Sequence, residues 1–200
     1  MSDERTTTEV NTGGLSALRR FAGAANVIGD KLAMFAAVLA VLCLFALLLL
    51  VLGQVIMGML SGIFPAAASA MSVSWEYAGY LMGAAFMFGM PQTLRLGGHI
   101  RVNVLFEALK GRSQVIADIL ISAVSAVIMG MLAQALSAMA IRAFLTNSLS
   151  TASLTPLWIP QGALGLAAWL FTLQLVVRVV ALLAGQPAEL PREYVGVSPE

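Results

Sequence analysis

The chain has 200 residues, of which 60% are hydrophobic and only 10% are charged, and its formal net charge is +1. A water-soluble domain of this size needs about a quarter of its residues charged, so the composition excludes an ordinary soluble protein and indicates an all-α integral membrane protein. The near-neutral charge gives no support for nucleic-acid binding. The single cysteine, Cys43, excludes an intramolecular disulfide framework and a multi-cysteine metal site.

Four segments are apolar over the roughly 20 residues that a helix needs to cross a bilayer. We expect membrane-spanning helices at about residues 32–60, 75–94, 115–144 and 157–183, which together form a four-helix membrane domain over residues 31–184. Residues 1–30 then form a polar leader and residues 185–200 a tail. The first apolar run is much longer than a signal-peptide core, so the first helix is predicted to be retained.

The ends of the second predicted helix carry strong local signals. It begins with Trp75 and Glu76, and Pro91 in its last turns predicts a kink or an early end. Gly97 and Gly98 follow and are expected to break the helix.

The third and fourth predicted helices carry a few polar and small residues. Gln134 is the deepest clear polar side chain of the third helix, where either a hydrogen bond between helices or a contact with a substrate would explain it. Thr155 is expected to cap the fourth helix, with Pro156 in its first turn. Small residues let helices approach closely in lipid. The predicted packing faces consist of Gly79 and Gly83 on the second helix and of Ser122, Ala126 and Gly130 on the third.

The basic residues indicate the orientation of the chain. Ten of the eleven Lys and Arg residues lie before the first helix, between the second and third, or at the end of the fourth and beyond. Arg142 alone lies on the other side. Because basic loops stay in the cytoplasm, both termini are predicted to be cytoplasmic.

The outer end of the predicted bundle has four candidate interaction residues: Trp75, Glu76, Arg142 and Trp158. The two tryptophans are typical of the aromatic belt at a membrane interface. Glu76 could pair with Arg142 or with a basic group of another chain, because both residues are expected near the outer surface.

The segment "RLGGHIRVNVLFEALKGR", from Arg95 to Arg112, interrupts the apolar sequence. Its large apolar residues recur at the spacing of one helix face, and Asn103 is suited to cap the start of that helix. The segment is therefore predicted to be a short amphipathic helix on the cytoplasmic membrane surface. It would either anchor on lipid headgroups or dock onto another protein.

No pattern in the sequence predicts catalysis. The single histidine, His99, cannot supply a two-histidine haem site or a multi-histidine metal centre, and no nucleophile–histidine constellation lies at membrane depth. We therefore expect no enzymatic activity, no catalytic, cofactor-binding or metal-binding residues, and no cofactor.

The loop motif R-x-G-x-H-I-R-V resembles the small membrane subunit, DctQ type, of tripartite ATP-independent periplasmic (TRAP) transporters. The residues that carry the resemblance are Arg95, Gly97, His99, Ile100, Arg101 and Val102, supported by "WE" at the second helix and "LTPLWIP" before the fourth. The resemblance covers all four predicted spans. This chain departs from the family at Asn103, where aspartate is usual, and so lacks the negative charge at that position.

The resemblance implies a multi-pass subunit of a secondary transporter in the inner membrane of a bacterium or archaeon. Its implied partners are a large membrane subunit of the DctM type, which moves as an elevator, and a periplasmic substrate-binding protein, besides membrane lipid. The implied role is a non-catalytic scaffold in sodium-coupled uptake of an organic acid. The loop motif, including Asn103, would then be a subunit or headgroup anchor.

Two alternatives belong to other functional classes. The small-residue faces also suit an independent transporter or channel that assembles as a homo-oligomer. An enzyme acting at the cytoplasmic interface through His99 and Arg101 is the third possibility.

Overall fold

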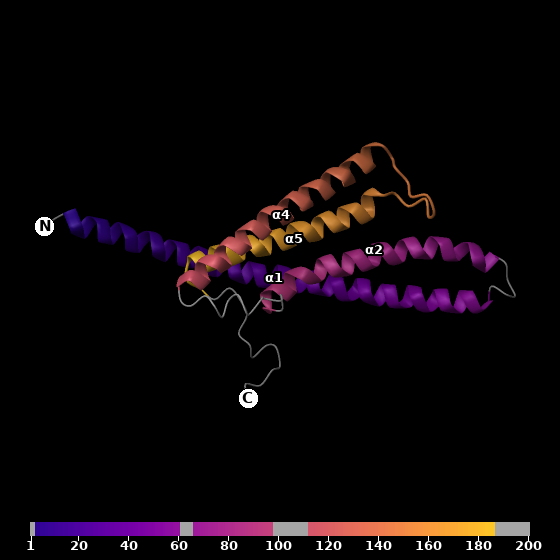
Figure 1. Cartoon of the computed structure of the whole chain (residues 1–200), viewed down its shortest axis with the longest axis horizontal. Coiled ribbons are helices and arrows are strands. Elements are labelled where there is room, and N and C mark those ends of the chain that lie inside the picture. Colours follow the sequence, from indigo (N-terminus) through magenta and orange to yellow (C-terminus); the bar gives the residue numbers. More distant parts are fainter. Residues whose placement is uncertain (1–2, 61–65, 98–111, 187–200) are drawn as a thin grey trace, which may run out of the picture.

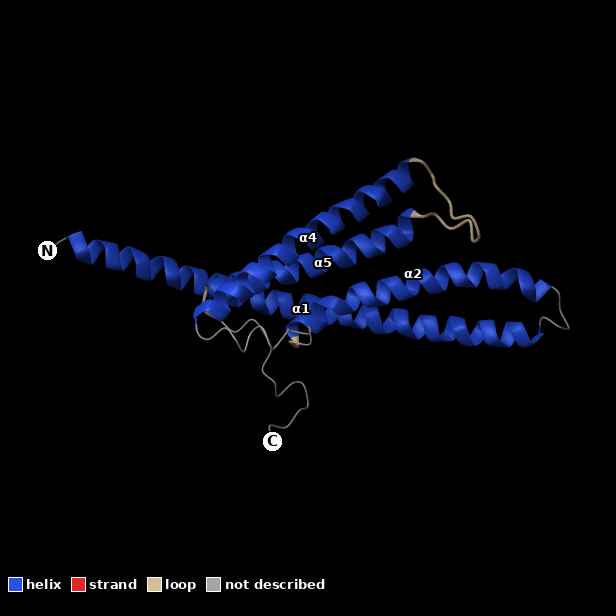
Figure 2. Ribbon diagram, in the orientation of Figure 1, coloured by secondary structure: helices blue, strands red, loops and turns tan. Residues whose placement is uncertain are grey.

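The computed structural model describes residues 3–60, 66–97 and 112–186, with side chains in residues 19–60, 73–97 and 113–186. Its helices are α1 (Asp3–Leu60), α2 (Ala66–Arg95), α4 (Arg112–Leu145) and α5 (Trp158–Leu183). Figure 2 shows that the described part is helical apart from the connections, where Leu149 and Pro156 form an isolated bridge. A helix satisfies its own backbone hydrogen bonds, which a chain in lipid requires. The predicted all-helical fold class and the order of the helices are confirmed.

Two antiparallel hairpins form the bundle (Figure 1). Helix α1 packs along α2, α4 packs along α5, and α5 also contacts α1 and α2. The N-terminal part of α1 projects beyond the other helices. Helix α5 therefore joins the two hairpins.

Small side chains fill the contacts between the helices. One core cluster consists of Ala36 and Ala40 of α1, Ala84 and Phe88 of α2, and Ala167 of α5. A second cluster joins Leu94 of α2 to Phe171 and Leu175 of α5, with Ala126 and Met129 of α4 packed against it. Alanine at these positions allows close approach of the backbones, as is usual for helices in lipid.

Three of the four helices are long and apolar enough to cross a membrane, namely the parts of α1, α4 and α5 at Arg19–Leu60, Ser113–Leu145 and Trp158–Leu183. Helix α2 is not among them, although it lies antiparallel to α1 and contacts α5. Large apolar side chains such as Phe35, Phe45 and Val127 point outward from the bundle. Such a surface suits lipid rather than water.

Two helix starts that were predicted from hydrophobicity differ from the observed ones. Helix α1 begins at Asp3 rather than near residue 32, and α2 begins at Ala66 rather than near Trp75. An apolar stretch marks the part of a helix that contacts lipid, whereas backbone hydrogen bonding continues past the bilayer edge. The 58 residues of α1 are therefore about 87 Å long, nearly three times the roughly 30 Å of a hydrocarbon core.

Local backbone chemistry explains two further ends. Pro91 does not end α2, which continues to Arg95. Gly97 follows with a φ of +68°, and its N–H donates to the carbonyl of Leu94 at 3.2 Å. The predicted break at Gly97 is confirmed, because glycine adopts this left-handed conformation without steric cost.

Thr155 does not cap α5. The helix begins at Trp158, the cap position is Leu157, and no side chain makes a cap hydrogen bond there. Thr155 instead bonds to Tyr77 and Ser153 of its surroundings.

Candidate functional site

A partly buried polar cluster joins three helices at the end of the bundle where α2 ends. The Arg95 cluster consists of Asn26 and Asp30 of α1, Arg95 of α2 and Gln174 of α5. Arg95 donates from Nη1 to Oδ1 of Asn26 at 3.1 Å and from Nη2 to the Asn26 carbonyl at 2.6 Å. Its Nη2 also lies 2.9 Å from Oδ1 of Asp30, while Nε2 of Gln174 donates to the Gly29 carbonyl at 2.5 Å.

The sequence of α1 creates the space for this cluster. Asn26, Gly29 and Asp30 are spaced at i, i+3 and i+4, so they share one helix face. A Cβ atom at Gly29 would lie 2.9 Å from Nη2 of Arg95 and 3.2 Å from Oε1 of Gln174. Glycine therefore leaves room for both side chains to reach α1, and a larger residue would force their ends to shift.

The two charged members of the Arg95 cluster differ in their exposure to solvent. The side chain of Arg95 is 5% exposed, whereas that of Asp30 is 39% exposed. Burial lowers the pKa of the Arg95 guanidinium below its ordinary value, and the Asp30 carboxylate opposes this shift. Because an arginine pKa lies so far above neutrality, Arg95 stays charged and depends on its partners on α1.

A second buried ion pair fixes α4 to α5 near the same end. Nη2 of Arg178 lies 3.1 and 3.2 Å from the two carboxylate oxygens of Asp118. Beyond it, Gln186 donates to the Arg19 carbonyl at 2.8 Å and accepts from Nδ2 of Asn26 at 3.4 Å. These contacts and the Arg95 cluster connect all four helices at one end of the bundle.

Glu76 forms the main polar contacts at the opposite end of the bundle. Its carboxylate accepts a hydrogen bond from the Tyr80 hydroxyl at 2.7 Å, another from the Ser150 hydroxyl, and a third from the Ser153 N–H at 3.0 Å. The Tyr77 hydroxyl is 2.6 Å from that of Thr155. Helix α2 thus holds the loop of residues 146–157 that connects α4 to α5.

The Glu76 contacts support an unusual loop conformation. Leu154, which follows Ser153, has a φ of +54°. A positive φ is unfavourable for a residue with a branched, bulky side chain and persists where the surroundings fix it. The hydrogen bond from the Ser153 N–H to Glu76 supplies such a restraint directly before this residue.

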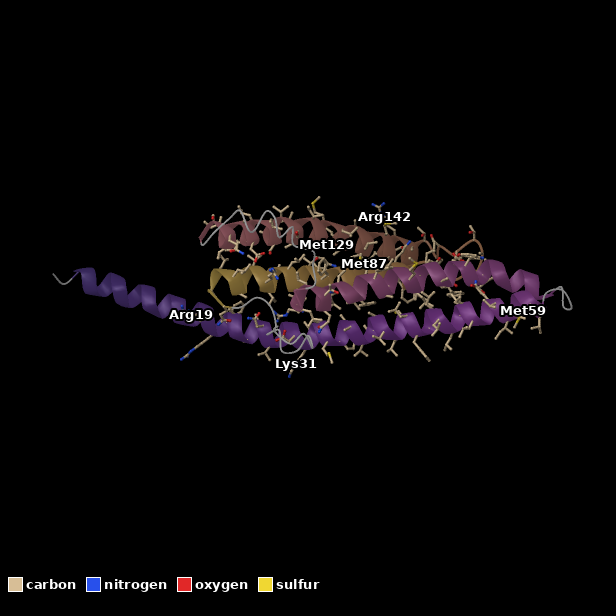
Figure 3. All side chains as sticks on the ribbon, turned by 60° about the horizontal axis from the view of Figure 1, so that its bottom comes forward. Arg19, Lys31, Met59, Met87, Met129 and Arg142 are labelled. Carbon is tan, nitrogen blue, oxygen red and sulfur yellow. The ribbon has the colours of Figure 1, made fainter. Side chains whose placement is uncertain are left out.

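The predicted pairing of Glu76 with Arg142 is not present in the described part of the chain. Glu76 is bonded to Tyr80 and to the α4–α5 loop, whereas Arg142 is exposed and projects from α4 away from the other helices (Figure 3). Trp75 and Trp158 are exposed, and the ring of Trp158 packs edge-on against Phe144 with 5.7 Å between the centroids.

The structure brings four of the five predicted packing residues into helix contacts. A Cβ atom at Gly83 would meet Leu164 at 3.5 Å and one at Gly130 would meet Thr172 at 3.6 Å, while Ser122 is buried and Ala126 packs against a core cluster. Gly79 has nothing within 4 Å of such an atom. Gln134 is exposed rather than bonded to another described helix.

The other loop-motif residues, His99, Ile100, Arg101 and Asn103, lie outside the described residues, as does the predicted amphipathic helix. Of that motif, the structure places Arg95 and Gly97. Among the described residues, no group of three or more His, Cys, Asp and Glu side chains could hold a metal ion.

The sequence did not reveal most of the residues that contact Arg95 at one end of the bundle and Glu76 at the other. Asn26, Asp30 and Gln174 were not singled out, nor were Ser150 and Ser153. A usable signal existed for Gln174, because a polar side chain within an apolar segment needs a hydrogen-bond partner. The serines had no comparable signal, since they occur in a polar loop.

Chemically, the described polar groups join helices to one another. Both buried arginines, Arg95 and Arg178, are paired with carboxylates of the same chain. Such pairs fix the relative positions of helices, because removing one partner leaves an uncompensated buried charge.

The chain matches a known family over most of its described membrane domain. A family model described as tripartite ATP-independent periplasmic transporters, DctQ component, matches residues 56–185. Comparisons with curated proteins and with solved structures gave no match. The matched region includes α2, α4, α5 and the loop held by Glu76.

Proposed function

The chain belongs to the DctQ family of TRAP transporter components, and on that basis we propose that it is a scaffold for the transporter's large membrane subunit. The chain is a multi-pass membrane protein and a small component of such a transporter. In this proposal the large subunit is of the DctM type and moves as an elevator. It takes up an organic acid together with sodium, and a periplasmic substrate-binding protein delivers that substrate.

The observation that carries the proposal is that the buried charged side chains pair with residues of the same chain. Arg95 is hydrogen-bonded to Asn26 and ion-paired with Asp30, and Arg178 is ion-paired with Asp118, so these charges connect helices of one chain. A scaffold needs helices that keep their relative positions while another subunit moves. The Arg95 cluster at one end and Glu76 at the other provide two such fixed points.

The membrane arrangement is part of the same proposal. We place both termini in the cytoplasm of a bacterial or archaeal cell, with the chain in the inner membrane, because basic residues gather at the Arg95 end. Helix α2 would be the fourth span, since its antiparallel packing along α1 keeps it at the same depth. The Glu76 end then faces the periplasm. Lipid surrounds the outward apolar side chains.

Reconstitution tests the proposal directly. The chain is co-expressed with the large subunit, purified in mild detergent and placed in vesicles with the binding protein and a sodium gradient. We expect the two membrane proteins to co-purify and substrate uptake to require all three proteins. Uptake by vesicles that contain this chain alone would contradict the scaffold role and favour an independent homo-oligomeric transporter. A stable monomer that fails to bind the large subunit would also contradict it.

A further inference from the structure

The outward face of α4 carries a regular stripe of side chains. The α4 stripe consists of Val124, Val127, Met131, Gln134, Ala138 and Ile141. Their spacing alternates between three and four residues, which is the spacing of a helix seam that receives another helix. Its four large apolar residues are between 58% and 67% exposed, and Gln134 and Ala138 are exposed as well.

Gln134 distinguishes this stripe from an ordinary lipid-facing surface. It lies eight residues from Arg142 and sixteen from Asp118, so about 12 Å and 24 Å separate it from these charged ends of α4. Its short side chain cannot cover either distance to reach water. Among the described residues it has no hydrogen-bond partner. A carboxamide exposed to hydrocarbon loses its hydrogen bonds to water without replacement.

The neighbours of Gln134 allow a helix to approach. Ala138 lies one turn further along the stripe and Ala135 is the next residue, and both are exposed. Small residues beside a polar one are the combination that holds helices together in lipid, since close backbones bring the polar group within bonding distance of the partner.

Arg142 argues against a second copy of this chain as the partner. Copies in one membrane share the same orientation, so a twofold pairing along the α4 stripe would be parallel and place each residue opposite its own counterpart. Arg142 is exposed and projects from α4 away from the other helices (Figure 3), and it lies eight residues, about two turns, beyond Gln134. Both arginines would then lie at the same level beside the interface, and α4 has no acidic residue near that level to pair with either of them.

We propose that the α4 stripe is the docking surface for a transmembrane helix of the large membrane subunit of the tripartite transporter. That helix bonds Gln134 with a polar side chain and presents an acidic group near Arg142. This assignment rests on the proposed function and adds to it the face, the depth and the chemistry of the contact.

Photo-crosslinking in the assembled transporter tests the position of the docking surface. A photoreactive phenylalanine derivative replaces Met131, one turn from Gln134, which itself is unchanged. The control replaces Phe45 of α1, which is 57% exposed and lies about 22 Å of helix from Asp30, as Met131 lies about 20 Å from Asp118. We expect Met131 to crosslink to the large subunit at least tenfold more than Phe45 does. Equal yields, adducts with lipid only, or crosslinked copies of this chain would overturn the proposal.

Substitution of Gln134 tests the chemistry. Gln134→Leu should weaken association with the large subunit about 3- to 20-fold, the effect of losing one hydrogen bond between membrane helices. Val127→Leu, on the same stripe, should leave association within twofold. Unchanged association for Gln134→Leu would refute the role of the amide.

The two proposals fail in different ways. If the unmodified chain does not co-purify with the large subunit, the proposed function is wrong. If it co-purifies and Met131 does not crosslink to that subunit, the scaffold role stands and the assignment to the α4 stripe is wrong.

Discussion

The ion pair between Asp30 and Arg95 should respond unequally to loss of either partner. Asp30→Asn leaves the Arg95 guanidinium, which is 5% exposed, without its counter-charge. Breaking a buried pair in this way costs about 3–5 kcal/mol, and the two remaining bonds to Asn26 place the expected loss near 3 kcal/mol. Arg95→Met instead leaves Asp30, which is 39% exposed and can be hydrated, so about 1–2 kcal/mol is expected.

Thermal unfolding in one detergent at one scan rate measures this asymmetry. For a chain of this size about 1 kcal/mol corresponds to 2–4 °C, so Asp30→Asn should lower the midpoint by about 6–12 °C and Arg95→Met by about 2–8 °C. The double variant should be no less stable than Asp30→Asn alone, because the uncompensated charge is then gone. Lys31→Gln, an exposed neighbour, should be neutral. A midpoint for Asp30→Asn within 2 °C of the unmodified chain would refute the reasoning.

Three further predictions concern the remaining contacts. Gly29→Ala should destabilise the protein by about 1–3 kcal/mol through the 2.9 Å approach to Arg95, whereas Gly53→Ala, with nothing within 4 Å, should be neutral or stabilising in the same thermal assay. Glu76→Ala should raise hydrogen exchange in the α4–α5 loop, because it removes the hydrogen bonds from Ser150 and Ser153, while Tyr77→Phe, which removes only the contact with Thr155, should have a smaller effect. Equal exchange in both variants would count against the Glu76 contacts. Gln174→Leu should change stability by less than about 1 kcal/mol, because Oε1 of Gln174 is already buried without a partner; a larger loss would show that the bond to the Gly29 carbonyl is indispensable.

The sequence predicted well those features of the fold that depend on the residues of a single segment. Each apolar segment is a local property, so the order of the helices followed directly, and Gly97 ended α2 for a reason confined to its own backbone. The starts of the first two helices were predicted too late, because hydrophobicity reports contact with lipid and not backbone hydrogen bonding, whereas α4 and α5 begin within three residues of their predicted starts. Asp3 and Ala66 begin helices outside the segments that apolar residues had marked.

Contacts between helices could not be predicted in the same way. Which residue of α1 faces Arg95 depends on the axial position and rotation of one helix relative to another, and a single residue of displacement turns a side chain by about 100°. Glu76 and Arg142 illustrate the difficulty. They were expected at the same end of the bundle, yet Glu76 is bonded to Ser150 and Ser153 while Arg142 points outward.

The unbroken length of α1 has a mechanical consequence. About 40 Å of helix separates Asp3 from Asp30, with no interruption in between. If this helix behaves as a rigid rod, it pivots at its contact with Arg95. A tilt of about 5° there moves the end at Asp3 by about 3–4 Å. A force applied near Asp3 likewise becomes a torque on the bundle, which acts first at the contact of Arg19 with Gln186 and then at the Arg95 cluster.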